Sequence, residues 1–535
     1  MKDIEAQDNN GASNRKISDK IKISKSLIMI NSGSFMLAFL LNITVVVWLQ
    51  QYLLKRISVD EYSIYPIVVS MMVFISLLET ILVPSLVRYA IEAFAVGDEK
   101  RLNQVFSTML SLTSFSGIAI LSGGIIFSWY IDSIFNIASH LAWDARIMMA
   151  LLILNISADI ILSPYRVGLN IQQKYYLMNI IKSLGEFFRL LILFVLLFSI
   201  STRILWVVVA TIISNISVIL AKVYYSQKAM PGLRFNKKDI RVDLLKKMLN
   251  FGGWNFMYMA GRTIRNNSDV IILNKFATAY DVSAFHIGRL FHRYALMSWE
   301  MIRLSTFPAL TAMHSLKMEQ SLKNAYLRGG RYALWIVLFI GAPLVAFREE
   351  VIILYLSEKF VVSAQVLLYL FLALPAELSD IMLSIIARAR GRMKELATIY
   401  LIMQIANIIL TLYLVIALKS GCVGSAFGTF ITALIFEPLF LWPIGLKLVN
   451  LSLMRFIRET VIPGIIPASA VGLLYYVIKT QFEVLTFTHI IEWVAIGSLV
   501  YTGVLFGFCL QASDKKDLAE AYMKIREMIY RKLRR

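Results

Sequence analysis

Arginine residues cluster inside two apolar segments of the sequence. Residues 249–273 carry Arg262, Arg265 and Asp269 at i, i+3 and i+7, which places all three on one face of a helix. Residues 282–313 carry a second helically spaced stripe of ionisable residues: His286, Arg289, Arg293, Glu300 and Arg303. Charges inside an apolar segment are costly, so they mark a functional site or an internal ion pair. Arginine outnumbers the acids, and its guanidinium binds phosphate oxygens bidentately, so the pattern favours an anion site.

Internal pairing is the alternative interpretation of the same residues. Arg265 is spaced to pair with Asp269 at i+4, and Arg289 and Arg303 could extend toward a membrane surface. Carboxylates in such segments are candidates for ion coupling or for pairing, and the ones of interest are Glu79, Asp269 and Glu300. Both interpretations require these side chains to lie within a membrane.

The composition indicates an all-α polytopic membrane protein. Apolar residues make up 58% of the 535 positions and charged residues only 16%, against about a quarter in soluble domains. Apolar runs long enough to cross a ~30 Å hydrocarbon layer recur along the chain, and we count about fourteen spans. The net charge of +20 lies mainly in loops and termini, where it contacts membrane lipids, so no nucleic-acid partner is expected. Two distant cysteines and the lack of ligand clusters predict no metal and no cofactor.

The distribution of cations predicts the topology. Most of the 54 Lys and Arg residues fall in alternate inter-span segments, including residues 225–248 and the final tail. Under the positive-inside rule, these segments and both termini are cytoplasmic in a bacterial inner membrane. Leu518, Tyr522 and Ile525 begin an apolar stripe opposite Lys and Arg, which predicts an amphipathic helix on the inner leaflet.

The sequence repeats itself at an offset of about 220 residues. Residues 61–63 (Glu-Tyr-Ser) match residues 281–283 (Asp-Val-Ser), and residues 159–163 (Asp-Ile-Ile-Leu-Ser) match residues 380–384 (Asp-Ile-Met-Leu-Ser). Six predicted spans separate the copies, so both halves have the same orientation. Parallel repeats of this kind place a substrate site near mid-membrane between two lobes.

The predicted organisation follows from the repeat and the spans. Its parts are an N-terminal tail (1–26), an N-lobe of six spans (27–224), a basic linker (225–248), a C-lobe of six spans (249–446), two extra spans (447–510) and a basic tail (511–535).

Several short motifs resemble the polysaccharide transporters of the multidrug/oligosaccharidyl-lipid/polysaccharide export superfamily, which include O-antigen and capsule-unit flippases. The motifs are residues 60–65 (Asp-Glu-Tyr-Ser-Ile-Tyr), 77–79 (Leu-Leu-Glu), 85–89 (Ser-Leu-Val-Arg-Tyr), 97–103 (Gly-Asp-Glu-Lys-Arg-Leu-Asn) and 268–273 (Ser-Asp-Val-Ile-Ile-Leu). The resemblance implies two six-helix lobes whose first, second, seventh and eighth spans line a V-shaped cavity. It also implies an undecaprenyl-pyrophosphate-linked oligosaccharide as the substrate, moved from the cytoplasmic to the periplasmic leaflet, with glycan polymerase machinery as a partner.

Three other functions remain open. A multidrug antiporter shares the implied fold, but its often cationic substrates call for an acidic cavity and it usually has twelve spans. A lipid II flippase also has a cationic cavity. A membrane-embedded glycan polymerase would expose catalytic residues on a large outer loop, and the longest predicted outer loop, around Asp132–Trp143, is short. The sequence therefore predicts a transporter rather than an enzyme.

Overall fold

The computed structural model describes residues 48–515 except 96, 173, 316–317, 483–485 and 512–513. The predicted N-terminal tail, most of the first predicted span and the amphipathic C-terminal helix lie outside the described residues. The chain divides into two compact units between Asn267 and Ser268, called unit 1 and unit 2 below, and each is described by itself. The described residues form helices, turns and loops without a β-strand, which confirms the all-α prediction.

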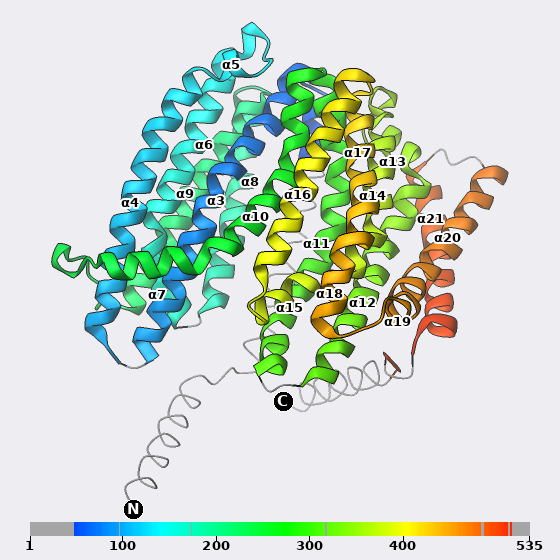
Figure 1. Cartoon of the computed structure of the whole chain (residues 1–535). Coiled ribbons are helices and arrows are strands. Elements are labelled where there is room, and N and C mark those ends of the chain that lie inside the picture. The colour runs from blue at the N-terminus through cyan, green and yellow to red at the C-terminus, as the bar shows by residue number, and fades with distance from the viewer. Residues whose placement is uncertain are drawn as a thin grey trace, which may run out of the picture. The chain divides into compact units, whose positions relative to one another are not determined.

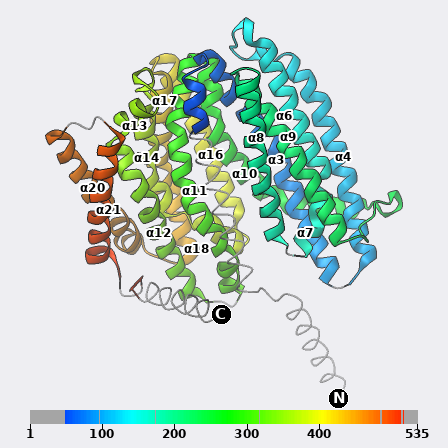
Figure 2. The same ribbon diagram turned by 180° about the vertical axis from the view of Figure 1, so that it is seen from behind.

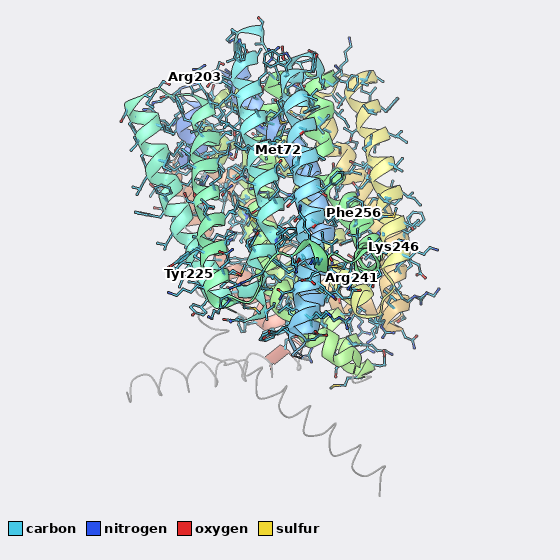
Figure 3. All side chains as sticks on the ribbon, turned by 90° about the vertical axis from the view of Figure 1, so that its left-hand side faces the viewer. Met72, Arg203, Tyr225, Arg241, Lys246 and Phe256 are labelled. Carbon is cyan, nitrogen blue, oxygen red and sulfur yellow. The ribbon has the colours of Figure 1, made fainter. Side chains whose placement is uncertain are left out.

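Unit 1 is built from long helices, most of which run side by side, while the last of them begins by crossing the others (Figure 1). They are α3 (Val59–Ala95), α4 (Glu99–Trp129), α6 (Ala142–Leu162), α8 (Tyr175–Ser199), α9 (Ile204–Ala229) and the first part of α10 (Val242–Phe276), with short α5 (Ile131–Ile134), α7 (Val167–Ile171) and 3₁₀ turns η1 (Ser139–Leu141), η2 (Ser163–Arg166) and η3 (Lys237–Asp239). Helix α6 packs on both α4 and α9, and α8 packs on α9. In Figure 3, whose labels all fall in unit 1, Arg203 lies at one end and Tyr225 and Arg241 lie toward the other.

Unit 2 contains the remaining helices (Figure 2). Several of them end in a π-helical turn. They are α11 (Ala279–Ser315), α12 (Glu319–Ala346), α13 (Arg348–Tyr355), α14 (Ser363–Ser379), α15 (Leu383–Ala389), α16 (Met393–Leu412), α17 (Gly421–Phe436), α18 (Trp442–Val449), α19 (Leu453–Phe456), α20 (Ile462–Gln481) and α21 (Phe487–Val504). The 3₁₀ turn is η4 (Glu358–Phe360), and the π turns are η5 (Tyr413–Ala417), η6 (Glu437–Leu441), η7 (Ile457–Val461) and η8 (Leu505–Cys509). Pro438 in η6 lacks the amide that a regular α-helical turn would use, which favours the wider π turn there.

Nine helical stretches in the described part of the chain are long and apolar enough to cross a membrane. The protein is therefore a multi-pass membrane protein, whereas the count of fourteen spans stays a prediction. Four more predicted spans, the second (65–90), fifth (177–200), seventh (249–273) and eighth (282–313), do form helices, namely α3, α8, α10 and α11. In α8 the central charges pair with each other, since Arg189 lies 2.8 Å from Glu186, which lowers the cost of placing both within a membrane.

The two predicted extra spans pack on α12 within unit 2. The Tyr501 hydroxyl donates to the Trp335 carbonyl at 2.8 Å, and Phe347 joins both spans in one apolar cluster. Two ion pairs also hold these spans to the rest of unit 2. Lys479 lies 2.7 Å from Glu350, and Arg331 lies 2.6 Å from Asp514 in a pair that is completely buried. The opposite surface exposes large apolar side chains such as Phe508, as expected for contact with lipid.

The predicted repeat has a structural counterpart in how two helices begin. Ser58 caps α3 by accepting from the Glu61 amide at 3.1 Å, and Thr278 caps α11 by accepting from the Asp281 amide at 3.1 Å. The carboxylates then reach a distant helix in the same unit. Glu61 accepts from the Ile204 amide of α9 at 2.8 Å, and Asp281 accepts from the Cys422 amide of α17 at 2.9 Å. Both units therefore contain the same arrangement at an offset of 220 residues. A hydroxyl caps the helix, and a carboxylate three residues later accepts a hydrogen bond from the backbone of another helix.

Candidate functional site

Both predicted arginine stripes lie on uninterrupted helices. Helix α10 contains 35 residues and α11 contains 37, so i, i+3 and i+7 spacing places side chains on a common face in each. Arg262 and Arg265 belong to unit 1, whereas His286, Arg289 and Arg293 belong to unit 2. That the two faces share one space stays a prediction.

The stripe on α11 occupies the least buried face of that helix. Phe285, Ile287 and Gly288 are buried, and Gly288 approaches α14 so closely that a Cβ atom would lie 2.7 Å from the Ser363 carbonyl oxygen. His286 and Arg289 are half-buried, and Arg293 is exposed. Close packing on one side thus leaves the cationic side of α11 the more accessible one.

The stripe on α10 is similarly accessible in its central turns. Arg262 and Arg265 are half-buried and the neighbouring Asn266 is exposed, whereas Tyr258 and Thr263 are buried. Both arginines therefore remain in part accessible, which lowers the cost of keeping their charges.

Asp269 has a structural partner on another helix of unit 2. Its side chain is only 2% exposed, and its Oδ1 atom accepts a hydrogen bond of 2.8 Å from the Ser425 hydroxyl of α17. This hydrogen bond helps to compensate for burying a carboxylate. Asp269 therefore joins α10 to α17, a role that the spacing of the α10 stripe did not indicate.

Three predicted site residues lie on described helices, but their side chains lie outside the described residues. They are Glu79 on α3 and Glu300 and Arg303 on α11. Their assignment stays a prediction. Elsewhere, in the part of the chain that the structure describes, no cluster of three or more His, Cys, Asp or Glu residues could hold a metal ion.

Sequence reasoning missed a band of uncharged polar residues between α16 and α17. Gln404, Asn407 and Thr411 line one face of α16 at i, i+3 and i+7 and are at most 2% exposed. The Asn407 amide lies 3.4 Å from the Thr429 hydroxyl oxygen, which is on the same face of α17 as Ser425. The spacing of these residues in an otherwise apolar segment could have revealed the band. Amide and hydroxyl oxygens at this depth can accept hydrogen bonds from water or coordinate a small cation.

No protein-family profile matches the chain. The uncharacterized membrane protein EpsK of Bacillus subtilis (strain 168) is 21% identical over 488 residues, which cover 90% of this chain and 93% of EpsK. An inward-closed structure of the lipid II flippase MurJ matches with a TM-score of 0.62 at 16% identity, covering 90% of this chain and 99% of MurJ.

An inward-facing structure of a multidrug resistance transporter of the MATE family, within the MOP superfamily, matches with a TM-score of 0.60 at 15% identity. It covers 82% of this chain and 98% of the transporter. The chain has the fold of these transporters. At such low identity the likeness concerns the fold alone, so the substrate has to be argued from the residues of this chain.

Proposed function

We propose that this protein is a flippase that moves a polyprenyl-pyrophosphate-linked oligosaccharide, such as an O-antigen, capsule or exopolysaccharide repeat unit, from the cytoplasmic to the periplasmic leaflet. The observation that carries the proposal is that α10 and α11 each carry helically spaced, at least partly accessible arginines in a chain with this fold. The MurJ structure supports it, because that protein is described as a flippase of lipid II, a lipid-linked substrate. The transporter would lie in the bacterial inner membrane with both termini in the cytoplasm.

Arg262, Arg265, Arg289 and Arg293 would hold the pyrophosphate while the sugar occupies the cavity. A guanidinium that binds phosphate oxygens bidentately contributes about 1.5–3 kcal/mol, or roughly ten- to a hundredfold in affinity. His286 and Arg303 would extend the same cationic surface. Asp269, Glu79 and Glu300 would act in ion coupling or pairing. Transport would follow from alternating access between the two lobes.

The decisive experiment measures glycan export, normalised to membrane protein level, in cells that depend on this chain. Alanine at each of the four arginines should reduce export, lysine should preserve part of it because the charge remains, and glutamate should abolish it. The matched control is Arg189→Ala, which removes an arginine from a membrane helix where it already pairs with Glu186. It should change protein level without changing export per molecule.

The Arg265/Asp269 double alanine variant separates a binding site from a structural ion pair. Because Asp269 also accepts a hydrogen bond from Ser425, the double variant is compared with Asp269→Ala alone. A structural pair predicts that the double variant exports as well as Asp269→Ala, whereas a pyrophosphate site predicts a further loss of export per molecule. Normal export by all four single alanine variants would rule the site out. Multidrug transport is the other function supported by the MATE likeness. Cellular resistance to cationic drugs that depends on the chain, with glycan export unaffected, would favour it.

A further inference from the structure

The segment between α9 and α10 is fixed to α4 within unit 1. We call residues 230–241 the strap. Its backbone amides donate to three polar side chains of α4: Arg234 to Asn103 at 3.2 Å, Asn236 to Ser107 at 3.1 Å, and Arg241 to Thr108 at 3.0 Å. Met230 and Leu233 of the strap also pack on the buried core of unit 1. The strap is therefore part of the folded unit rather than a loose connection.

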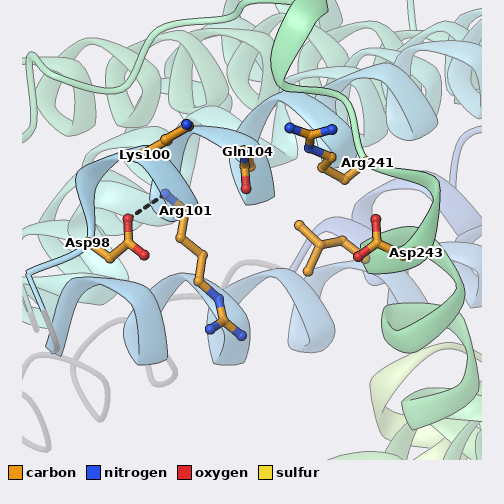
Figure 4. Close-up of a pocket in the computed structure, with 7 residues that line it drawn as sticks. Asp98, Lys100, Arg101, Gln104, Arg241 and Asp243 are labelled. Atoms are coloured by element: carbon orange, nitrogen blue, oxygen red, sulfur yellow. Dashed lines mark hydrogen bonds between the residues drawn. The ribbon is translucent and has the colours of Figure 1, made fainter.

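A pocket of about 340 Å³ lies where the strap leads into α10 and faces the beginning of α4. Figure 4 shows its polar lining: Asp98, Lys100, Arg101, Gln104, Arg241 and Asp243. The floor includes Leu244, which belongs to the buried core. Two distant parts of the sequence thus contribute cations to one hollow.

The cations of this pocket are available for an anionic ligand. Asp98 caps α4 by accepting from the Arg101 amide at 2.8 Å, so this carboxylate already has a structural role. Within the described residues, the side chains of Lys100, Arg101 and Arg241 form no ion pair. The beginnings of two long helices, α4 and α10, add partial positive charge at the same place.

Exposed apolar side chains on the segment that supplies Arg241 indicate what kind of anion the pocket takes. Phe235, Ile240 and Val242 are 44%, 38% and 63% exposed, and the same stretch of chain carries Arg234, Lys237 and Lys238. Exposed apolar residues interleaved with cations are typical of protein segments that lie in a membrane interface. A soluble phosphate would gain nothing from these apolar side chains, whereas a lipid would contact them.

We propose that this pocket binds the phosphate of an anionic phospholipid headgroup while Phe235, Ile240 and Val242 insert among the lipid chains. Arg101 and Lys100 hold the phosphate from α4, and Arg241 holds it from the strap. The bound lipid links α4 to the beginning of α10 and keeps the strap in place. This site is separate from the arginines proposed to bind the transported substrate, and its test does not depend on transport.

The test uses the full chain, purified in detergent, with native mass spectrometry to measure binding of phosphatidylglycerol and phosphatidylcholine. The pocket variant is Arg101→Gln with Arg241→Gln. The matched control is Lys237→Gln with Lys238→Gln, which removes the same charge from the strap outside the pocket lining. A cation that contacts the lipid phosphate is worth about fivefold in affinity, so loss of two should weaken phosphatidylglycerol binding roughly 25-fold. The control lysines do not line the pocket, so their loss should weaken binding less than about threefold in detergent, where no membrane surface attracts them. Circular dichroism should show the same helix content in both.

Three outcomes would overturn the proposal. One is equal binding of phosphatidylglycerol and phosphatidylcholine by the unsubstituted chain. Another is an equal loss in the pocket variant and the control, which would indicate general attraction to the basic strap. The last is displacement of the lipid by millimolar inorganic phosphate together with unchanged binding after Phe235→Ala and Ile240→Ala, which would indicate a site for soluble phosphate.

Discussion

The two units share their helix caps but differ in the residues available for chemistry. Glu61 and Asp281 occupy equivalent positions and each accepts from the first amides of a distant helix. The stripe on α11 has no such counterpart: at the same offset, His286, Arg289 and Arg293 correspond to Pro66, Val69 and Val73 of α3. Asp269 likewise corresponds to Leu49. The duplication therefore preserved the carboxylate pair Glu61 and Asp281, whereas Asp269 and the cations of α11 belong to one copy.

The largest expected effect concerns an anchor found only in unit 2. Arg331 is completely buried, bonds both carboxylate oxygens of Asp514 at 2.6 and 2.7 Å and donates to the Glu459 carbonyl, whereas its repeat position in unit 1 is Ser111. Asp514→Ala leaves the guanidinium buried without its carboxylate and should lower the free energy of unfolding by about 3–5 kcal/mol. Chemical unfolding in detergent measures it.

The control for this anchor is Glu459→Ala. Its side-chain pair with Arg455, at 2.8 Å, is partly exposed, and its loss should cost at most about 1 kcal/mol. An equal loss in the free energy of unfolding in the two variants would mean that burial does not make the Arg331–Asp514 pair more important for stability.

The next largest effect compares the stripe with its apolar counterpart. Arg289→Ala should reduce glycan export per molecule by roughly ten- to a hundredfold, because a charge-assisted bidentate contact is lost. Val69→Ala, at the equivalent position of α3, should leave export within about twofold. Similar losses at both positions would mean that the two copies share one binding function and that the asymmetry in charge is incidental.

A smaller effect tests the shared caps directly. Glu61→Ala and Asp281→Ala should each destabilise the protein by about 0.5–2 kcal/mol, since each removes the acceptor at a helix beginning. Asp281→Ala should cost more, because Asp281 also accepts from the Thr278 hydroxyl at 2.6 Å. Thermal unfolding of the two variants, with Asp281→Asn as the variant that retains an acceptor, measures the difference. No effect at one of the two positions would contradict a common structural role.

The smallest effect concerns an ion pair confined to unit 1. Arg146 donates twice to Asp132, at 2.9 Å each, and this hydrogen bonding lowers the pKa of the Asp132 carboxyl below its ordinary value of 3.8. The repeat positions in unit 2 are Ile352 and Val366. A lowered pKa in the folded state contributes stability above the ordinary value, and that stability is lost as the pH falls through the folded-state pKa.

Asp132→Asn should therefore reduce the melting temperature slightly at pH 7 and leave it unchanged relative to the parent near pH 2. Melting curves at the two pH values provide the measurement. A deficit that persists undiminished at low pH would show that the carboxylate charge is not responsible.

Much of the scaffold could be predicted because its signals are local. Apolar runs predicted the helices, the spacing of Arg262 and Arg265 predicted a common face on α10, and the 220-residue match led to Glu61 and Asp281. The lobe boundaries and the roles of the predicted site residues stay predictions. The partners of those two carboxylates could not be predicted, since the receiving amides lie more than a hundred residues away.

The sequence alone determined the class of the protein, because hydrophobic length and the cost of exposing backbone polar groups in lipid leave few alternatives to helices. It also determined which helices carry cations, because residue identity and the helical period suffice for that. Only the tertiary structure decided that Asp269 joins Ser425, that Asp514 is buried against Arg331, and that the strap closes a pocket on α4. Each of these depends on the approach of segments far apart in the chain, which is set by side-chain packing within each unit and has no local signature.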